Sequence, residues 1–322
     1  MDIRKYLGQP FLDDSFPLPL DMPFTTGQAK QQHVSADNLT KLCREGLLRR
    51  MLQGVYVAAQ AGDSIPLRAH ALSLVVPPDC VVCDRHAGWL HGATMVLRPN
   101  EHLELMPISV FRPSGNGRLR NGISASGERN LEPQDVVELH GLRVTTPLRT
   151  AWDLGRVRWT EPAISALDAM LRLDVFSREE LLAGVERFRR MRWITTLRTM
   201  APLADGRSES PGESVLRLRW IECSLPAPTP QYEVFRGGRL LARLDLANPE
   251  LRFAAEYDGA EWHSSPEQQQ HDSLRRADVS HEDWLVLPFT SVNVFGRRAN
   301  CEELLRSGAR DARARFGHRI AS

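Results

Sequence analysis

The sequence predicts a mixed α/β protein of three parts, and three observations support this prediction. A helix–turn–helix pattern followed by two short strands lies near the N-terminus, and a hairpin followed by a third strand lies in the last third of the chain. Small and polar residues, "APLADGRSESPGES" at 201–214, separate that last third from a middle region of mixed strands and helices. We therefore expect a winged helix at 1–60, an α+β domain at 61–205 and a mixed sheet flanked by helices at 206–322.

Composition and charge restrict the classes of partner and compartment. The net charge is +1, so a nucleic acid would have to be bound by a local basic patch. No run of residues approaches the length of a membrane span, so no membrane partner is expected. The five cysteines are odd in number, and the first 24 residues contain prolines and acids but no apolar stretch of the kind a secretory leader needs. We expect a reduced, cytoplasmic protein.

One group of residues raises the alternative of a zinc site. The segment "CVVCDRHAGWLH" holds Cys80, Cys83, His86 and His91. The two ligand pairs of a zinc finger usually lie about 12 residues or more apart, whereas these pairs almost touch. The segment "DCVVCD" is more typical of a short buried strand.

The first 60 residues carry the winged-helix pattern. Thr25 or Thr26 caps a first short helix, and Ser35 begins a second whose apolar residues lie on one stripe. Gly46 ends this second helix, and two short strands follow with a turn near Gln53-Gly54. The alternative to a DNA-binding winged helix is a small structural helical hairpin.

The predicted DNA contacts are the cations of this region. They lie on the second helix and the first strand of the wing, and they are Lys41, Arg44, Arg49 and Arg50. Together they would form a local basic patch on a nearly neutral chain, which is the feature that a DNA-binding surface requires.

The C-terminal part begins with a helix that carries an acid in its first turn. Ser210, Pro211 and Glu213 match a capping box with proline at the first helical position. Capping alone would explain Glu213.

Further acids fall where a sheet is expected to pack. A hairpin turns at Gly237-Gly238, and a short connection then places Asp245 opposite Glu256, with Asp258 as its diagonal neighbour. Carboxylates gathered in this way repel one another, so an arginine or a cation must offset the repulsion. Arg243 is one candidate. Mg²⁺ (or Mn²⁺) is a better one, because it prefers oxygen ligands and could promote hydrolysis of a phosphodiester.

At these residues the chain resembles a known superfamily. The segments "ESVLRLRW", "LDLANPELRFAAEYDGAEWH" and "DSLRRADVSHEDWLVLPF" are similar to very-short-patch-repair endonucleases of the PD-(D/E)XK superfamily. The resemblance, over roughly residues 211–316, implies a restriction-endonuclease-like sheet in which Asp245 and Glu256 hold the metal ion. It implies that Glu213 orders the site and that His263 moves a proton or orients water. The lysine expected two residues after the strand glutamate is Asp258 here, which leaves an inert site open.

A polar loop after His263 leads into a predicted helix that carries Arg275 and Arg276. Arginines in this position could neutralise phosphate or pair with the acids, and phosphate is the favoured partner.

The first two thirds of the chain resembles a second family. The segments "LTKLCREGLLRRMLQGVYV", "HAGWLHGA" and "GLRVTTPLRTAWDLGR" are similar to bacterial AbiEi-type antitoxin-like proteins, some of which continue into a nuclease-like domain. This resemblance implies a DNA-associated bacterial protein with a role in phage defence and a toxin or another defence protein as its partner.

Two functions follow from these observations. The first is a Mg²⁺-dependent DNA endonuclease that is targeted by the winged helix, with Asp245 and Glu256 as ligands and Asp258 assisting. The alternative is an antitoxin-type DNA-binding transcriptional regulator whose nuclease fold is inactive. An RNA substrate, such as tRNA, is a third possibility.

Overall fold

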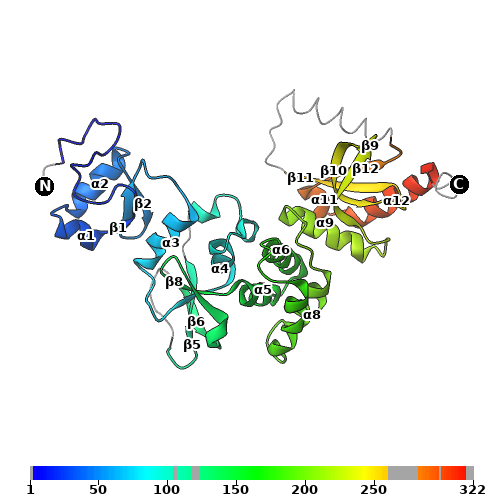
Figure 1. Ribbon diagram of the computed structural model, residues 1–322, viewed down its shortest axis with the longest axis horizontal. Coiled ribbons are helices and arrows are strands. Elements are labelled where there is room, and N and C mark those ends of the chain that lie inside the picture. The colour runs from blue at the N-terminus through cyan, green and yellow to red at the C-terminus, as the bar shows by residue number, and fades with distance from the viewer. Residues whose placement is uncertain (1–2, 104–106, 118–123, 260–281, 297–298, 317–322) are drawn as a thin grey trace. The chain divides into compact units, whose positions relative to one another are not determined.

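The computed structural model describes residues 3–103, 107–117, 124–259, 282–296 and 299–316. The chain divides into two compact units, Met1–Thr150 and Ala151–Ser322 (Figure 1). Helices and strands occur in both units, so the α/β class is confirmed. The three domain boundaries expected from the sequence stay predictions. None of the helices in the described ranges has the length and apolarity needed to cross a membrane.

The N-terminal part of the first unit is a winged helix. Its elements are β1 (Phe24–Thr25), α1 (Thr26–Gln31), α2 (Ala36–Arg44), β2 (Leu48–Leu52) and β3 (Val55–Ala58). The strands form an antiparallel sheet in the order β1-β3-β2. The predicted helices, cap and hairpin are therefore confirmed. The strand β1 was not foreseen, because two residues are too few to give a periodic pattern.

The core of the winged helix explains why the N-terminal segment folds onto it. Tyr6 and Phe16 are buried and meet edge to face, with ring centroids 5.5 Å apart. The Tyr6 hydroxyl donates to the Ser15 carbonyl oxygen at 2.6 Å, so its polar end is satisfied. These aromatic residues pack with Leu39 and Leu42 of α2, which fixes the inner face of that helix.

The rest of the first unit is built around a five-stranded sheet. Its elements are α3 (Ile65–Ser73), β4 (Val81–Val82), α4 (Asp84–Leu90), β5 (Ile108–Pro113), β6 (Ser124–Arg129), β7 (Val136–Leu139), β8 (Leu142–Thr145) and the start of α5 (Pro147–Gly155). The strand order is β6-β5-β4-β8-β7, with β5–β6 and β4–β8 parallel. A buried ion pair joins Arg149 of α5 to Asp135 at 2.6 Å.

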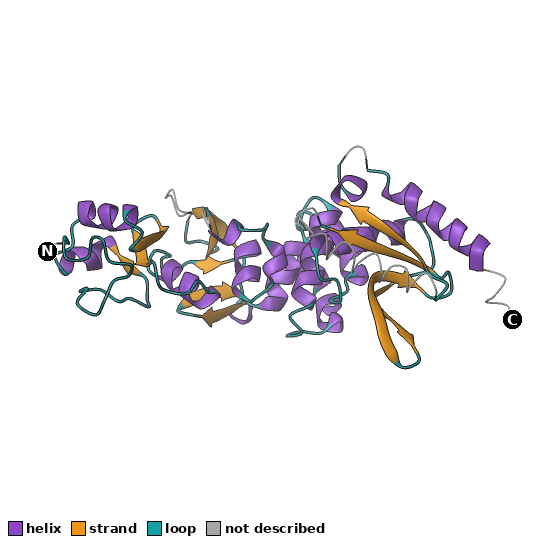
Figure 2. Ribbon diagram, turned by 90° about the horizontal axis from the view of Figure 1, so that it is seen from above, coloured by secondary structure: helices purple, strands orange, loops and turns teal. Residues whose placement is uncertain are grey.

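The second unit begins with helices, continues with a sheet and ends with the helix α12 (Cys301–Phe316) (Figure 2). The helices are α6 (Thr160–Leu171), α7 (Arg178–Ala183), α8 (Ile194–Met200) and α9 (Pro211–Glu222). The remaining elements are β9 (Thr229–Arg236), β10 (Arg239–Asn248), β11 (Phe253–Asp258), β12 (Leu285–Thr290), α11 (Ser291–Val294) and α12 (Cys301–Phe316). The strand order is β12-β11-β10-β9, with β11 and β12 parallel and the other pairs antiparallel.

Close contacts hold α9 and α12 against this sheet. Trp220 of α9 stacks on Phe253 of β11, with ring centroids 5.0 Å apart. A Cβ atom at Gly308 of α12 would lie 2.6 Å from the side chains of Phe253 and Leu287, so only glycine permits this approach. The sheet of the last part is therefore flanked by helices, as the sequence predicted.

Candidate functional site

The outer face of α2 carries the first candidate site. The Ser35 side chain caps the helix by accepting from the Asn38 backbone N–H at 3.2 Å. Because Leu39 and Leu42 point inward, Lys41 and Arg44 point to solvent. Arg44 is 75% exposed and reaches Glu45 only at 3.8 Å, so its guanidinium group is available to a phosphate.

The two arginines of β2 have different environments. Arg50 is exposed. Burial raises the pKa of the nearby Cys43 thiol, and the positive charge of Arg50 opposes this shift. Arg49 is half-buried, and its Nη2 donates to the Ala61 carbonyl oxygen at 2.7 Å. Arg49 therefore holds the chain that follows the wing. Three of the four predicted DNA-contacting cations, Lys41, Arg44 and Arg50, are exposed.

The second candidate site lies around Glu213, at the start of α9. Glu213 is 8% exposed, and its backbone N–H donates to the Ser210 hydroxyl at 3.1 Å. Its carboxylate accepts from the Glu209 backbone N–H at 2.8 Å and from the Gln231 side-chain amide at 2.9 Å. Burial raises the pKa of Glu213, and the negative charge of Asp245 raises it further. Glu213 and Asp245 thus lie near one another.

The ladder between β10 and β11 ends beside the strand acids. Its pairs run from Asn248 opposite Phe253 to Leu246 opposite Ala255, and the opposition of Asp245 and Glu256 stays a prediction. One carboxylate oxygen of Asp245 accepts from the Tyr257 backbone N–H at 2.8 Å. Glu256 is 5% exposed, whereas Asp258, at the end of β11, is exposed.

Side chains along β10 do not alternate regularly. Leu244 and Leu246 would share one face of a regular strand, but they belong to two separate apolar clusters. Gln231 of β9, between the partners of Leu244 and Leu246, has a left-handed φ of 53°.

The neighbourhood of the acids is only partly described. His263, Arg275 and Arg276 lie outside the described residues. Within the described ranges, no three His, Cys, Asp or Glu side chains are spaced to hold a metal ion. Metal binding by Asp245, Glu256 and Asp258 therefore stays a prediction.

The arginine that was weighed as a partner of these acids has another acidic partner. Arg243 pairs with Glu209 at 2.8 Å, and Glu209 also pairs at 3.2 Å with Arg172, the residue that follows α6. Glu209 thus links the strand β10 to the helix α6 beside Glu213.

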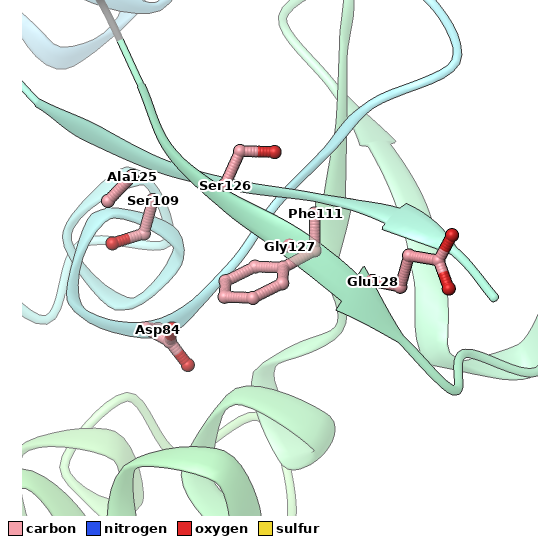
Figure 3. Close-up of a pocket in the computed structure, with 7 residues that line it drawn as sticks. All are labelled: Asp84, Ser109, Phe111, Ala125, Ser126, Gly127 and Glu128. Carbon is pink, nitrogen blue, oxygen red and sulfur yellow. The ribbon is translucent and has the colours of Figure 1, made fainter. Parts of the chain in front are cut away.

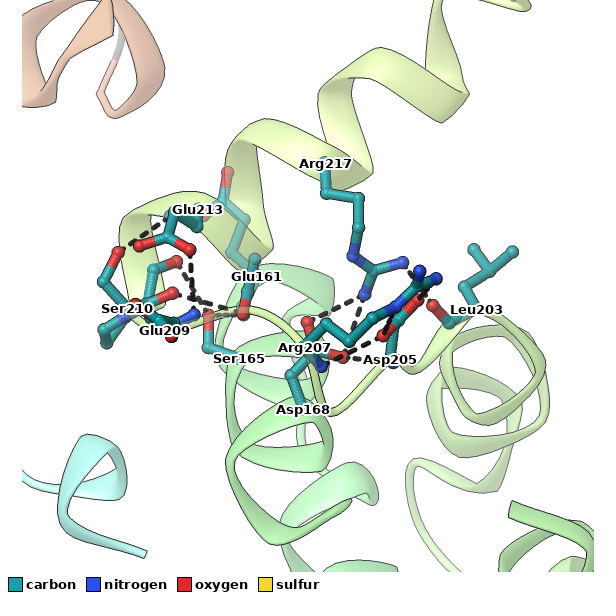
Figure 4. A network of polar contacts seen from close by, with 12 residues as sticks. Glu161, Ser165, Asp168, Leu203, Asp205, Arg207, Glu209, Ser210, Glu213 and Arg217 are labelled. Carbon is teal, nitrogen blue, oxygen red and sulfur yellow. Dashed lines mark hydrogen bonds and ion pairs between the residues drawn. The ribbon is translucent and has the colours of Figure 1, made fainter. Parts of the chain in front are cut away.

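A polar network that the sequence did not reveal joins α6 to α9 (Figure 4). Arg217 donates to both carboxylate oxygens of Asp168, at 2.8 and 2.9 Å, and both side chains are buried. Asp168 also accepts from the Asp205 backbone N–H at 2.8 Å. A second contact between the two helices joins Arg219 to Glu161. No sequence motif marks these pairs, because their members are separated by about fifty residues and each lies in an ordinary helix.

The residues considered as zinc ligands make other contacts. The Cys83 thiol lies 3.4 Å from the Val81 carbonyl oxygen, and His86 Nδ1 accepts from the Ser109 backbone N–H at 3.1 Å. His91 Nε2 lies 2.7 Å from the Thr145 carbonyl oxygen, and burial lowers the pKa of this histidine. These contacts fix the two histidines to separate strands of the sheet.

A hollow of about 810 Å³ lies beside β5 and β6 (Figure 3). The residues that line it are Asp84, Ser109, Phe111, Ala125, Ser126, Gly127 and Glu128. Arg129 stacks over the Phe111 ring at 3.9 Å and forms two hydrogen bonds to the Asp84 carboxylate, at 2.7 and 3.0 Å. Asp84 has a left-handed φ of 57°, so this ion pair anchors a strained start of α4.

The comparisons with known proteins agree with one part of the sequence-based interpretation. The profile of the AbiEi antitoxin C-terminal domain matches residues 80–203. Uncharacterized proteins of two Mycobacterium tuberculosis strains, CDC 1551 / Oshkosh and ATCC 25618 / H37Rv, are each 33% identical over 245 residues. That alignment covers 76% of this chain and 86% of each relative. The resemblance of residues 211–316 to repair endonucleases stays a prediction. The chain belongs to the same family as these mycobacterial proteins, and its residues 80–203 are similar to the AbiEi antitoxin C-terminal domain.

Proposed function

We propose that this protein is an antitoxin-type regulator that binds duplex DNA through its winged helix, with a toxin protein as its partner. The observation that carries this proposal is the orientation of α2. Its leucines are buried, while Lys41 and Arg44 face solvent beside Arg50 of the wing. A helix presented in this way fits the major groove, with cations at its edge for the phosphates. The antitoxin domain that follows supports the same role.

The charge of the segment supports DNA as the partner. Between Gln28 and Ala58 the sequence holds five basic and two acidic residues, although the whole chain has a net charge of +1. Contacts of cations with phosphates release counterions, so affinity for DNA falls as the salt concentration rises. The winged helix should therefore account for much of the salt dependence of DNA binding.

The test measures fluorescence anisotropy of labelled duplexes taken from the region upstream of the gene, with scrambled duplexes for comparison. The full chain is compared with the double variant Lys41→Ala/Arg44→Ala at several salt concentrations. Because each lost phosphate contact removes about 0.9 from the slope of log K against log salt, the variant should lose about 1.8. The matched control is Arg310→Ala/Arg313→Ala, which removes two exposed arginines from α12. Equal affinity and slope in wild type and the α2 variant would refute DNA binding by this surface.

A second candidate function is metal-dependent hydrolysis of a phosphodiester. The observation that favours it is the raised pKa of Glu213, which is caused first by burial and then by the negative charge of Asp245. This repulsion would be relieved by a cation, and the available donors are carboxylate oxygens, which suit Mg²⁺ or Mn²⁺. A bound ion of this type would activate water and stabilise charge on the phosphate.

The chain's own residues would prepare the site for that ion. Ser210 and Gln231 hold Glu213 in place, and the Tyr257 backbone N–H orients Asp245. Glu256 lies on the neighbouring strand, β11. These contacts position the carboxylates before any ion binds.

The test of this second function has two readouts. Nicking of supercoiled plasmid in Mg²⁺ or Mn²⁺ should be present in wild type and lost in Asp245→Ala, while gel-shift binding persists. Thermal unfolding with and without Mn²⁺ should show a stabilisation by the ion that Asp245→Ala lacks. If wild type binds DNA but cuts neither DNA nor RNA in either ion, the hydrolysis proposal is refuted and only the regulator proposal stands.

A further inference from the structure

The β9–β10 hairpin projects beyond the sheet to which it belongs (Figure 2). Strand β10 pairs with β11 only from Leu246 to Asn248, whereas it pairs with β9 from Arg239 onward. The end of the hairpin is therefore a two-stranded ribbon. It turns at Gly237 and Gly238, whose φ values of 56° and 81° suit a tight two-residue turn.

The ribbon is anchored at its base and exposed at its end. Val234 and Ala242 are buried in a cluster with Leu244 and Trp284, and the Tyr232 ring lies 5.3 Å from that of Trp284. A shift in the strand register between Leu240 and Ala242 marks the point where the exposed end begins. The end is thus held firmly but buries little apolar surface of its own.

The two faces of the exposed end carry different chemistry. Arg236 lies directly opposite Arg239 on one face. Phe235 lies opposite Leu240 on the other face, and these two side chains are 53% and 47% exposed. Two cations placed opposite one another destabilise a ribbon, and two exposed apolar side chains gain nothing from water.

The sequence of the ribbon indicates which kind of partner would offset the repulsion between its arginines. The segment 234–243, "VFRGGRLLAR", holds three arginines and no acid. Two of the arginines have acidic partners outside the segment, Arg236 at Glu282 and Arg243 at Glu209. A polyanion complements this charge. Among polyanions, duplex DNA also offers a place for the apolar pair, because aromatic and aliphatic side chains can wedge between base steps in a groove.

We propose that the end of the β9–β10 ribbon is a second DNA-binding element. Arg236 and Arg239 contact phosphates, while Phe235 and Leu240 enter the groove between them. The inference rests on the proposed function, because it assumes that the winged helix brings the protein to DNA. It extends that function by a contact made from the second unit of the chain.

The test compares three double variants of the full chain in the anisotropy assay. Arg236→Ala/Arg239→Ala should weaken binding about tenfold or more at low salt and reduce the salt slope by about 1.8. Phe235→Ser/Leu240→Ser should weaken binding without changing the slope, because it removes no charge. Arg310→Ala/Arg313→Ala is the charge control, and Val292→Ser is the apolar control because Val292 is 73% exposed. Thermal unfolding checks that each variant folds.

The possible outcomes separate the two proposals. If wild type fails to bind DNA, both proposals are overturned. If the α2 variant weakens binding while both ribbon variants bind as wild type does, only the ribbon proposal is overturned. If the ribbon variants keep DNA binding but lose a protein partner in a pull-down, the ribbon is a protein-binding element and the inference is wrong. Weaker DNA binding by both ribbon variants, with unchanged controls, supports it.

Discussion

The buried ion pair between α6 and α9 allows a quantitative prediction. In Asp168→Ala, the Arg217 guanidinium loses two hydrogen bonds and the carboxylate that it binds directly, and it keeps the Leu203 carbonyl oxygen as an acceptor. Both side chains are 5% exposed or less, so water cannot replace the carboxylate without opening the interface. Leaving a buried charge unpaired in this way lowers the free energy of unfolding by about 3–5 kcal/mol.

The assay is thermal unfolding followed by circular dichroism. Since 1 kcal/mol shifts the midpoint by about 2–4 °C in a unit of this size, the expected loss is about 6–20 °C. The double variant Asp168→Leu/Arg217→Met should recover most of this loss, because it removes the stranded charge together with its partner. Arg198→Met, which breaks an exposed ion pair with Glu186, should leave the midpoint almost unchanged. A double variant that is no more stable than Asp168→Ala would refute the reasoning.

Two further predictions concern the start of α9. The pKa of Glu213 is raised in the folded state, so its ionisation opposes folding, and the free energy of unfolding should fall as the pH rises above the usual range for a glutamate. Urea unfolding between pH 4 and pH 8 measures this dependence. Glu213→Gln should abolish this part of it, and Asp245→Asn should weaken it. A Cβ atom at Gly212 would lie 2.1 Å from the Tyr257 ring, so Gly212→Ala should destabilise the protein by about 1–3 kcal/mol, and Gly212→Ala/Tyr257→Leu should be more stable than the single variant in the same assay.

Local patterns made the winged helix and the C-terminal hairpin predictable. Ser35 caps its helix as expected, and the turn at Gly237-Gly238 sets the register of the two strands. The pairing of Leu246 with Ala255 followed from the short connection between β10 and β11. Each of these features depends on residues that are close in sequence, and local rules therefore suffice.

Features that depend on distant contacts or backbone irregularities were not predictable. Arg49 was expected to face DNA, but it bonds the Ala61 carbonyl oxygen beside a register shift in the wing. Leu244 and Leu246 lie in separate apolar clusters, and Gln231 on the paired strand has a left-handed φ. Side-chain period alone carries no information about such distortions.

The ion pair between Asp168 of α6 and Arg217 of α9 also limits which fragments of the protein can fold alone. A fragment cut at the limits of the antitoxin match, residues 80–203, would keep Asp168 and discard Arg217. The fragment would expose the face of α6 that packs against α9, and we expect it to aggregate when expressed alone. Residues 80–203, which match the antitoxin domain, are thus not expected to fold on their own. Recombination between relatives should keep them together with α9.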